Sequence, residues 1–501
     1  MNPTATRRAP NRVAGRRTPT TTTSTPPCPE QPPGVVVRVS TGGSWRSQRP
    51  MWIWGCQTWP DSRSGISLPC PPAHSVRPSG GSCTTTGIRT AVHPRSIQRC
   101  RRTPHRARHG GAPGPGRWHM RKVRPFREWV VKVAQQCNLA CDHCYVYELQ
   151  DTSWRRKPSV IPEASVNRLA EKVAEHARAH ALPAVRIVLH GGEPLLAGKQ
   201  RIEHIVSVLT SELRGVSDCD ISLQSNGTLL DSDWLDLFHR YGMSVGISLD
   251  GDRTANDRHR RSRNGRSSHT AVLKGLELLR RPENRARYSG LLCTVDLAND
   301  PVAVYEELLS HEPPMINFLL PHSTWEHPPP GHDSLATPYA EWLLAIFERW
   351  YTAPVQETRI PRFEDIMERA LSGRALSGAV GAVSDFIVVE SDLSVELPDN
   401  LKAAYDGAAA TGLNLLDHDF DTVARHPAVV AARGAGPAPL AADCLACPVV
   451  RLCGGGLRAH RFHPRNGFDN PSVYCADLRL LTTRIRDRVV ADVREWFGRA
   501  S

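Results

Sequence analysis

The chain has 501 residues, of which 40% are hydrophobic and 23% are charged, so it is long enough for two or three domains with ample cores. No run of about 18 apolar residues occurs, and we therefore expect no membrane-spanning helix. The net charge of +13 points to nucleic acid only until its distribution is considered. Residues 1–120 contain 18 arginines, no lysine and two acids, a net charge of +16, which leaves the rest of the chain at −3. We expect neither a nucleic acid nor a membrane as partner.

Residues 1–120 lack the pattern of a folded domain. They hold 18 of the 41 prolines, and no stretch keeps a helical or a strand period of apolar residues. We expect this segment to be disordered, and Met120, directly before the first patterned stretch, is a candidate for the true start of the protein. Its cysteines show no spacing typical of ligands and are assigned no role: Cys28, Cys56, Cys70, Cys83 and Cys100.

Strand-like and helix-like segments alternate after residue 120. The expected strands are 129–134, 185–189, 221–224, 245–249, 288–295 and 316–320, and the expected helices are 163–180, 201–213, 234–241, 270–280 and 301–310. This order predicts an α/β fold with a parallel sheet, flat or curled into a partial barrel. Chemistry in such sheets gathers where the carboxyl ends of the strands meet their loops. The unusual motifs all follow strands, so we expect them to share that edge.

Three cysteines lie in one eight-residue loop after the first strand, as Cys137-x-x-x-Cys141-x-x-Cys144. Three thiolates suit a soft metal or an iron–sulfur cluster, whereas a structural zinc site normally takes a fourth protein ligand. On a four-iron cluster, three cysteines leave one iron open for another ligand. The spacing therefore favours a catalytic iron–sulfur centre over free thiols.

The segment 137–145, CNLACDHCY, resembles the signature of the radical SAM enzymes. The resemblance implies a partial (β/α)6 barrel and a [4Fe–4S] cluster held by Cys137, Cys141 and Cys144. It further implies that the open iron binds S-adenosyl-L-methionine and that one electron cleaves this cofactor to a 5′-deoxyadenosyl radical. The cofactor then supplies the difficult chemistry, and the protein positions it.

The loops after the next three strands fit the same resemblance. Two adjacent glycines allow a close approach of the backbone to a ligand, and Glu193 offers an acceptor for the methionyl ammonium. By resemblance, His143 packs near the adenine, and Ser248 and Arg260 reach the ribose and the carboxylate of the cofactor. The dipeptide Asn226-Gly227 is also a common turn. The expected cofactor contacts are His143, Gly191, Gly192, Glu193, Asn226, Ser248 and Arg260.

A second cysteine set lies near the end of the chain: Cys444, Cys447, Cys453 and Cys475. From spacing alone, a zinc site and a fully ligated iron–sulfur cluster are both open, and disulfides are not expected without a secretory signal. The pattern resembles half of the SPASM extension of peptide-modifying radical SAM enzymes. Leu457 stands where two-cluster members have a further cysteine, and residues 386–404 contain none. The resemblance thus implies one auxiliary [4Fe–4S] cluster.

Within the superfamily, segments 248–260, 320–330 and 454–460 are similar to the FxsB family of peptide maturases. This resemblance, over roughly residues 121–485, implies a carbon–carbon cyclophane crosslink in a short, ribosomally made precursor peptide. It implies a reductant such as flavodoxin or ferredoxin, and a cytoplasmic location. The expected domains are a disordered tail (1–120), a radical SAM core (121–340), a bridging region (341–435) and an auxiliary iron–sulfur domain (436–501).

Other chemistry remains open at this point. The same radical could form a thioether, epimerise a residue, or oxidise a sulfatase residue to formylglycine. The enzymes that form formylglycine resemble the form with two auxiliary clusters, which this sequence does not keep. A zinc-binding scaffold without enzymatic activity is the alternative from another class. The lone cysteines Cys219 and Cys293 lie on or beside expected strands and are interpreted as core residues.

Overall fold

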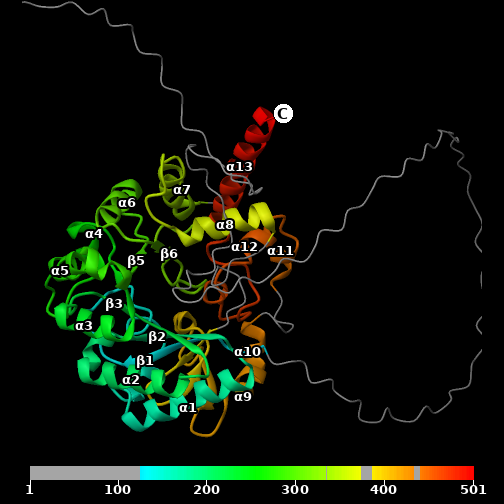
Figure 1. The fold of residues 1–501 in the computed structure, drawn as a ribbon. Helices are drawn as coiled ribbons and strands as arrows, with labels where there is room; N and C mark the ends of the chain where they lie inside the picture. Colours follow the sequence, from blue (N-terminus) through cyan, green and yellow to red (C-terminus); the bar gives the residue numbers. More distant parts are fainter. Residues whose placement is uncertain (1–123, 334–335, 374–385, 434–439, 501) are drawn as a thin grey trace, which may run out of the picture.

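A computed structural model describes residues 124–333, 336–373, 386–433 and 440–500 (Figure 1). The expectations for residues 1–120, including Met120 and the five cysteines of that segment, lie outside the described residues. In the part of the chain that is described, no helix is both long enough and apolar enough to span a bilayer.

The described strands form one nine-stranded sheet with the order β6-β5-β4-β3-β2-β1-β7-β8-β9. All six expected strands are present, and neighbours among them pair in parallel. Their apolar residues are buried because helices connect each strand to the next and cover the sheet. The six strands are β1 (Glu128–Ala134), β2 (Ala184–Gly191), β3 (Asp218–Ser225), β4 (Ser244–Ser248), β5 (Tyr288–Thr294) and β6 (Ile316–Leu319).

Three further strands make the sheet mixed rather than parallel throughout. β7 (Phe386–Val389) pairs in parallel with β1, whereas β8 (Ser394–Glu396) and β9 (Ala410–Asn414) continue in antiparallel order. The sequence pattern did not predict them, because runs of three to five residues are too short to show a clear period. The sheet of the core therefore continues into a segment that lies more than 60 residues beyond β6.

The five expected helices are also present, within two residues of their predicted bounds. They are α1 (Glu163–Ala179), α2 (Lys199–Leu213), α3 (Ser232–Tyr241), α5 (His269–Arg280) and α6 (Pro301–Ser310). The short helix α4 (Arg253–His259) was not predicted. Asp231, Asp252 and Asp300 each begin a helix, because their side chains accept the backbone N–H three residues later.

The C-terminal part packs against one end of this core. α13 (Cys475–Ala500) contacts α7 (Pro338–Tyr351) and α8 (Pro361–Ser372), and α12 (Val450–Cys453) contacts α8 (Figure 1). The remaining helices are α9 (Phe420–Arg425), α10 (Pro427–Ala432) and α11 (Ala442–Leu445). Proline at the first turn of α6, α7, α8 and α10 fits the position where no helical N–H is lost.

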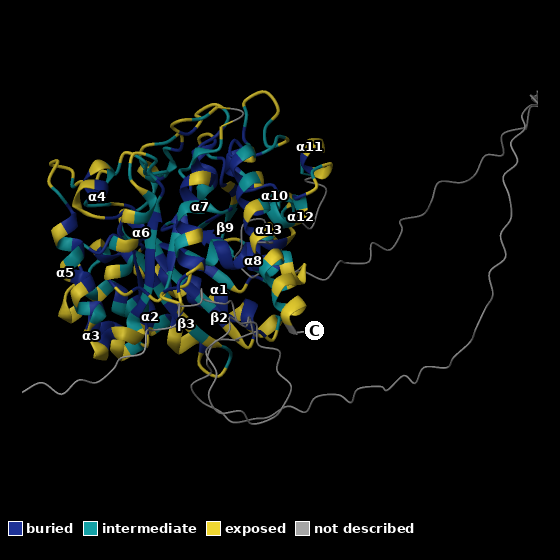
Figure 2. Ribbon diagram, turned by 90° about the horizontal axis from the view of Figure 1, so that it is seen from above, coloured by how far each residue is buried: buried dark blue, intermediate teal, exposed yellow. Residues whose placement is uncertain are grey.

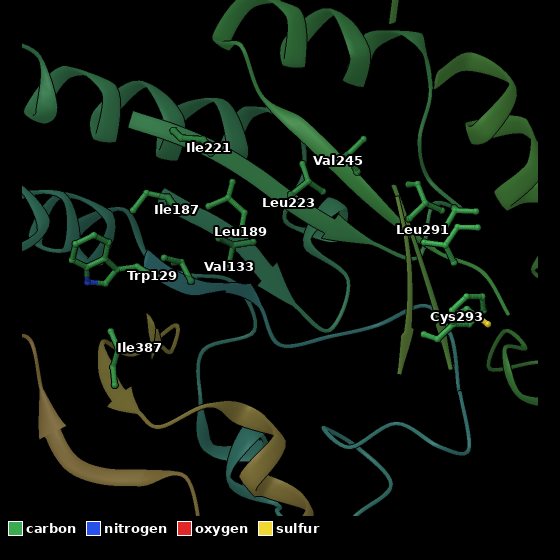
Figure 3. Packing of buried hydrophobic residues seen from close by; sticks show 14 of the residues in the cluster. Trp129, Val133, Ile187, Leu189, Ile221, Leu223, Val245, Leu291, Cys293 and Ile387 are labelled. Carbon is green, nitrogen blue, oxygen red and sulfur yellow. The ribbon is translucent and has the colours of Figure 1, made fainter. Parts of the chain in front are cut away.

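The core lies between the sheet and its helices. Figure 2 shows the strands buried at the centre and the exposed residues on the outer faces of the helices. Side chains from the strands β1 to β8 meet there, among them Trp129, Ile187, Leu223 and Ile387 (Figure 3). Cys293 is 1% exposed within this cluster, which confirms its predicted core position, whereas Cys219 is half-buried and packs against the edge of the cluster.

A buried histidine joins the start of the sheet to two helices. The Nε2 atom of His176 accepts the backbone N–H of Phe126 at 3.1 Å, so the neutral ring carries its proton on Nδ1. That atom lies 3.1 Å from a carboxylate oxygen of Asp421, which His180 also contacts at 2.7 Å. Because Nδ1 bears a proton, this group is a hydrogen-bonded link between α1 and α9 rather than a metal site. Burial lowers the pKa of His176 to about 4.

This histidine makes the stability of the fold sensitive to acid. An unfolded histidine takes up a proton near pH 6.5, whereas the native ring stays neutral until its pKa of about 4. Its contribution is therefore complete above pH 6.5 and decreases by about 1 kcal/mol per pH unit as the pH falls toward 4. We expect His176→Gln to flatten the decrease in melting temperature between pH 7.5 and 5.5. An identical pH profile in parent and variant would contradict this role.

Candidate active site

The cysteine loop leaves β1 and is held in place by residues that follow α4. The backbone N–H of Ala140 donates to the carbonyl of Arg261 at 2.8 Å, and Leu139 pairs with Ser262. The guanidinium of Arg263 donates to the carbonyl of Cys137 at 2.8 Å. The loop after β1 and the loop after β4 therefore lie together, as expected for the carboxyl edge of a parallel sheet.

The three thiols of this loop, Cys137, Cys141 and Cys144, are half-buried and not disulfide-bonded. Burial, together with the charge of neighbouring thiols, raises the pKa of Cys137 to about 11 and that of Cys141 to about 12. Three such groups become thiolates together only when a bound cation compensates their charge. Three convergent thiols without a fourth protein thiol fit an iron–sulfur cluster with an open iron.

The two glycines after β2 pack against the chain itself. The N–H of Gly192 donates to Ala134 and that of Glu193 to Gln136, both at the end of β1 and the start of the cysteine loop. A Cβ on Gly191 would lie 2.1 Å from the carbonyl oxygen of Ala134, and one on Gly192 would lie 2.3 Å from that of Gln136. The two glycines therefore allow close contact between the backbone of the loop after β2 and that of the cysteine loop. This contact is separate from their predicted approach to a ligand.

Glu193 is fully buried and bonds to the chain on both oxygens. Its carboxylate accepts Ser225 Oγ at 2.8 Å and the backbone N–H groups of Asn226 at 2.7 Å and Leu195 at 3.1 Å. Burial raises the pKa of Glu193 to about 7, although these hydrogen bonds lower it. The side chain predicted to meet the methionyl ammonium thus ties the loop after β2 to the loop after β3.

Asn226 contacts the cysteine loop directly. Its Nδ2 donates to Asn138 Oδ1 at 2.9 Å and lies 3.7 Å from the sulfur of Cys137. Its Oδ1 accepts the N–H and the hydroxyl of Thr228, which is an Asx turn. Asn226 is thus a turn residue, as one interpretation of the sequence predicted, and the same side chain contacts the cysteine loop. Its contact to the cofactor stays a prediction.

Arg260 forms a buried ion pair with Asp250. Its Nε donates to Asp250 Oδ2 at 2.6 Å, and the two side chains are 12% and 2% exposed. Burial raises the pKa of Asp250, but Arg260, together with His143 and the backbone N–H of Thr294, lowers it, so the pKa lies below its ordinary value. The charge of Arg260 also lowers the pKa of Cys141, which places a fixed cation beside the thiols. The structure thus gives this arginine an internal partner in addition to its predicted ligand.

His143 and Ser248 lie beside this pair. Burial, followed by the charge of Arg260, lowers the pKa of His143 to about 4, so its ring is neutral at pH 7. The ring lies 5.3 Å from that of His259, whose Nδ1 contacts Asp142 at 2.8 Å. Ser248 Oγ accepts Gln224 Nε2 at 3.1 Å. The seven residues predicted to contact the cofactor thus lie in the cysteine loop, at or just beyond the ends of β2, β3 and β4, or directly after α4, and their contacts to the cofactor stay a prediction.

The four cysteines of the second set line one cavity of about 500 Å³. Cys444 lies in α11 and Cys447 two residues after it, Cys453 ends α12, and Cys475 begins α13. All four are unpaired thiols, and the charges of the first three raise the pKa of Cys475 after burial. Four thiols around one cavity fit a fully ligated iron–sulfur cluster or a zinc ion.

A polar group centred on Asp399 was not predicted from the sequence, and it reaches the cysteine loop through Tyr145. Asp399 accepts Lys132 Nζ at 2.5 Å and the hydroxyl of Tyr145 at 3.0 Å, and Lys132 also contacts His190 at 3.0 Å. Burial raises the pKa of Asp399, but Lys132 holds it well below its usual range. A lysine inside the apolar strand WVVKVA was the available signal, because a buried lysine needs a partner.

We expect Gly192→Ala to displace the cysteine loop. The new Cβ would lie 1.9 Å from the hydroxyl of Tyr147 and 2.3 Å from the carbonyl oxygen of Gln136, and the backbone cannot yield without moving that loop. Most iron at Cys137, Cys141 and Cys144 should be lost, as measured by iron analysis and EPR. Gly498→Ala, where an added Cβ meets nothing within 4 Å, is the control. Parental iron content in Gly192→Ala would refute the close-contact argument.

We expect Arg260→Ala to destabilise the protein by about 3–5 kcal/mol, because it leaves the buried Asp250 carboxylate without its cation. Thermal unfolding of the purified protein measures this loss. The double variant Arg260→Ala with Asp250→Asn removes the unpaired charge and should recover part of the stability. If the double variant is no more stable than Arg260→Ala, the ion pair is not the cause.

Residues 131–283 match the model of the Radical SAM superfamily. The chain is 28% identical over 228 residues to a serine-type anaerobic sulfatase-maturating enzyme of Klebsiella aerogenes, covering 45% of this chain and 54% of the relative. It is 23% identical over 358 residues to a cysteine-type enzyme of the same name from Clostridium perfringens, covering 70% and 94%. The chain spans about half the length of the first of these relatives.

Solved structures show the same fold. The structure described as native anSMEcpe with bound AdoMet superposes with a TM-score of 0.63 at 20% identity, covering 74% of this chain and 99% of that one. Streptococcus suis SuiB bound to the precursor peptide SuiA gives a TM-score of 0.50 at 11% identity, covering 70% and 76%. Residues 131–283 are therefore similar to the Radical SAM superfamily, and the chain has the radical SAM α/β fold with a mixed sheet.

Proposed function

We propose that this enzyme uses a 5′-deoxyadenosyl radical to install a carbon–carbon cyclophane crosslink in a ribosomally made peptide. The observation that carries the radical chemistry is the three-thiol loop fixed at the carboxyl edge of the sheet by Gly191, Gly192 and residues 261–263. Relatives whose names refer to sulfatase maturation, and a neighbour bound to a precursor peptide, support a peptide or protein substrate. The crosslink itself rests on the resemblance to the FxsB family.

Cys137, Cys141 and Cys144 would hold a [4Fe–4S] cluster, which with S-adenosyl-L-methionine supplies the radical when both are bound. The residues of the chain then have distinct tasks. Arg260 stays charged in its ion pair and offsets the negative charge of the thiolates. Glu193 and Asn226 hold the loops after β2 and β3 against the cysteine loop. Gly192, His143 and Ser248 remain the proposed contacts to the cofactor.

Residues 436–501 would form the auxiliary domain, with a second [4Fe–4S] cluster at Cys444, Cys447, Cys453 and Cys475. The cavity lined by all four thiols supports this assignment. Residues 121–340 would be the radical SAM core and 341–435 the bridging region. The precursor peptide and a reductant such as flavodoxin or ferredoxin are the proposed partners, in the cytoplasm.

Formylglycine formation in a sulfatase is the second candidate, because the sulfatase-maturating enzymes are the named relatives. The absence of cysteines between residues 386 and 404 separates this chain from the two-auxiliary-cluster pattern that we associate with that activity. An aldehyde-specific hydrazide reagent distinguishes the products, since it labels formylglycine and leaves a carbon–carbon crosslink unlabelled.

The radical chemistry can be tested before the substrate is known. Anaerobically purified, reduced protein supplied with S-adenosyl-L-methionine should release 5′-deoxyadenosine, measured by chromatography, and should contain about eight iron atoms per chain. Cys141→Ala should abolish the release, because two thiolates cannot hold the open-iron cluster, whereas Cys219→Ala at the core edge should not. About two zinc ions and no iron in the parent protein would establish the zinc scaffold instead.

A further inference from the structure

Three consecutive glycines follow Cys453, and all three have left-handed backbone angles. Their φ values are 63° at Gly454, 76° at Gly455 and 70° at Gly456. A Cβ on Gly455 would lie 2.6 Å from Leu440, and one on Gly456 would lie 2.7 Å from Leu478. Glycine adopts left-handed angles without steric strain, but fixing three flexible glycines in a row costs conformational entropy, which contacts from the surroundings must offset.

One side chain holds this turn. The guanidinium of Arg461 donates to all three glycine carbonyls: Nε to Gly455 at 2.9 Å, and Nη2 to Gly454 at 3.1 Å and to Gly456 at 3.0 Å. A planar fork of donors is required for such a three-point contact, and a lysine ammonium cannot reproduce it. Arg461 therefore fixes the backbone immediately after a proposed cluster ligand.

The same guanidinium is a charge placed next to the cysteine cavity. Arg461 donates to the carbonyl of Gly455, which lines this cavity together with the four cysteines. Burial lowers the pKa of Arg461, whereas the charges of Cys444 and Cys453 raise it. Burial raises the pKa of Cys444, and Arg461 is the group that most opposes this increase. The backbone amides of Gly455 and Gly456 likewise act on Cys453, lowering its pKa after burial has raised it. Within the described residues, no carboxylate forms an ion pair with Arg461.

We propose that Arg461 is a positioning residue that sets the reduction potential of the auxiliary cluster. This inference rests on the proposed cluster at Cys444, Cys447, Cys453 and Cys475, whose ligands line one cavity. An all-thiolate [4Fe–4S] cluster becomes more negative on reduction, so a nearby cation and hydrogen bonds toward its sulfurs favour the reduced form. Arg461 itself is the cation. By holding the glycine turn, it also positions the backbone N–H groups of Gly455 and Gly456. The cluster is then a stronger electron acceptor than four thiolates alone would make it.

An EPR redox titration of the reconstituted full chain tests the proposal. In Arg461→Gln, the ratio of reduced to oxidised auxiliary cluster at a fixed applied potential should fall about tenfold, which is 59 mV for one electron. In Arg461→Lys, which keeps the charge and loses the three-point contact, the shift should be smaller. Arg451→Gln is the matched control, since it removes the same charge from an exposed position two residues before Cys453. The potential of the cluster at Cys137, Cys141 and Cys144 should stay constant in all variants.

Iron analysis and melting temperature accompany each titration. Arg461→Gln protein that keeps both clusters at the parental potentials overturns the proposal, and so does an equal shift in Arg451→Gln. If Arg461→Gln does not retain the second cluster, Arg461→Lys becomes the test. Its ratio of reduced to oxidised auxiliary cluster should then fall by less than tenfold relative to the parent, and a larger fall would overturn the proposal. A parent chain with only one cluster, or with zinc at the four cysteines, would instead refute the proposed auxiliary cluster.

Discussion

The close contact between the loop after β2 and the entry to the cysteine loop is the constraint on which the active site depends. Gly191 and Gly192 bring one backbone against another, where any side chain would collide with the carbonyl oxygens of Ala134 and Gln136. Glu193, the next residue, is then buried at the point where it can accept donors from the loop after β3. A contact between two backbones thus fixes three loops at once, before any cofactor is bound.

Buried ion pairs are the second feature that organises the site. Arg260 with Asp250, Lys132 with Asp399, and Lys402 with Glu390 and Glu396 all lie at or below the carboxyl edge of the sheet. Such pairs add little net stability, because desolvation offsets most of their attraction. They do hold charges in defined places, since a carboxylate or an ammonium in a low-dielectric interior cannot leave its partner. The buried ion pairs therefore impose a fixed electrostatic field on the thiols and on any bound cofactor.

The sequence predicted the six core strands, their helices and the cysteine loop, because each shows a long apolar period or an unusual spacing. β7, β8 and β9 escaped prediction because three to five residues do not show a period. The partners of Glu193 and Arg260 could not be predicted from the sequence for a different reason. A motif indicates which residue types a site needs, whereas Ser225 and Asp250 become partners only through the pairing of distant strands.

Two hydrogen bonds join the core to the C-terminal part that carries the second cysteine set. The hydroxyl of Tyr474, the residue before Cys475, donates to the carbonyl of Pro321 at 2.9 Å, and Trp325 donates to Pro471 at 2.8 Å. Both core residues belong to the loop that follows β6, so the strand order that builds the sheet also positions Cys475. Tyr474 is completely buried, and its hydroxyl requires this partner. This hydrogen bond therefore ties the residue before α13 to the loop after β6, and the position of Cys475 depends on the core sheet.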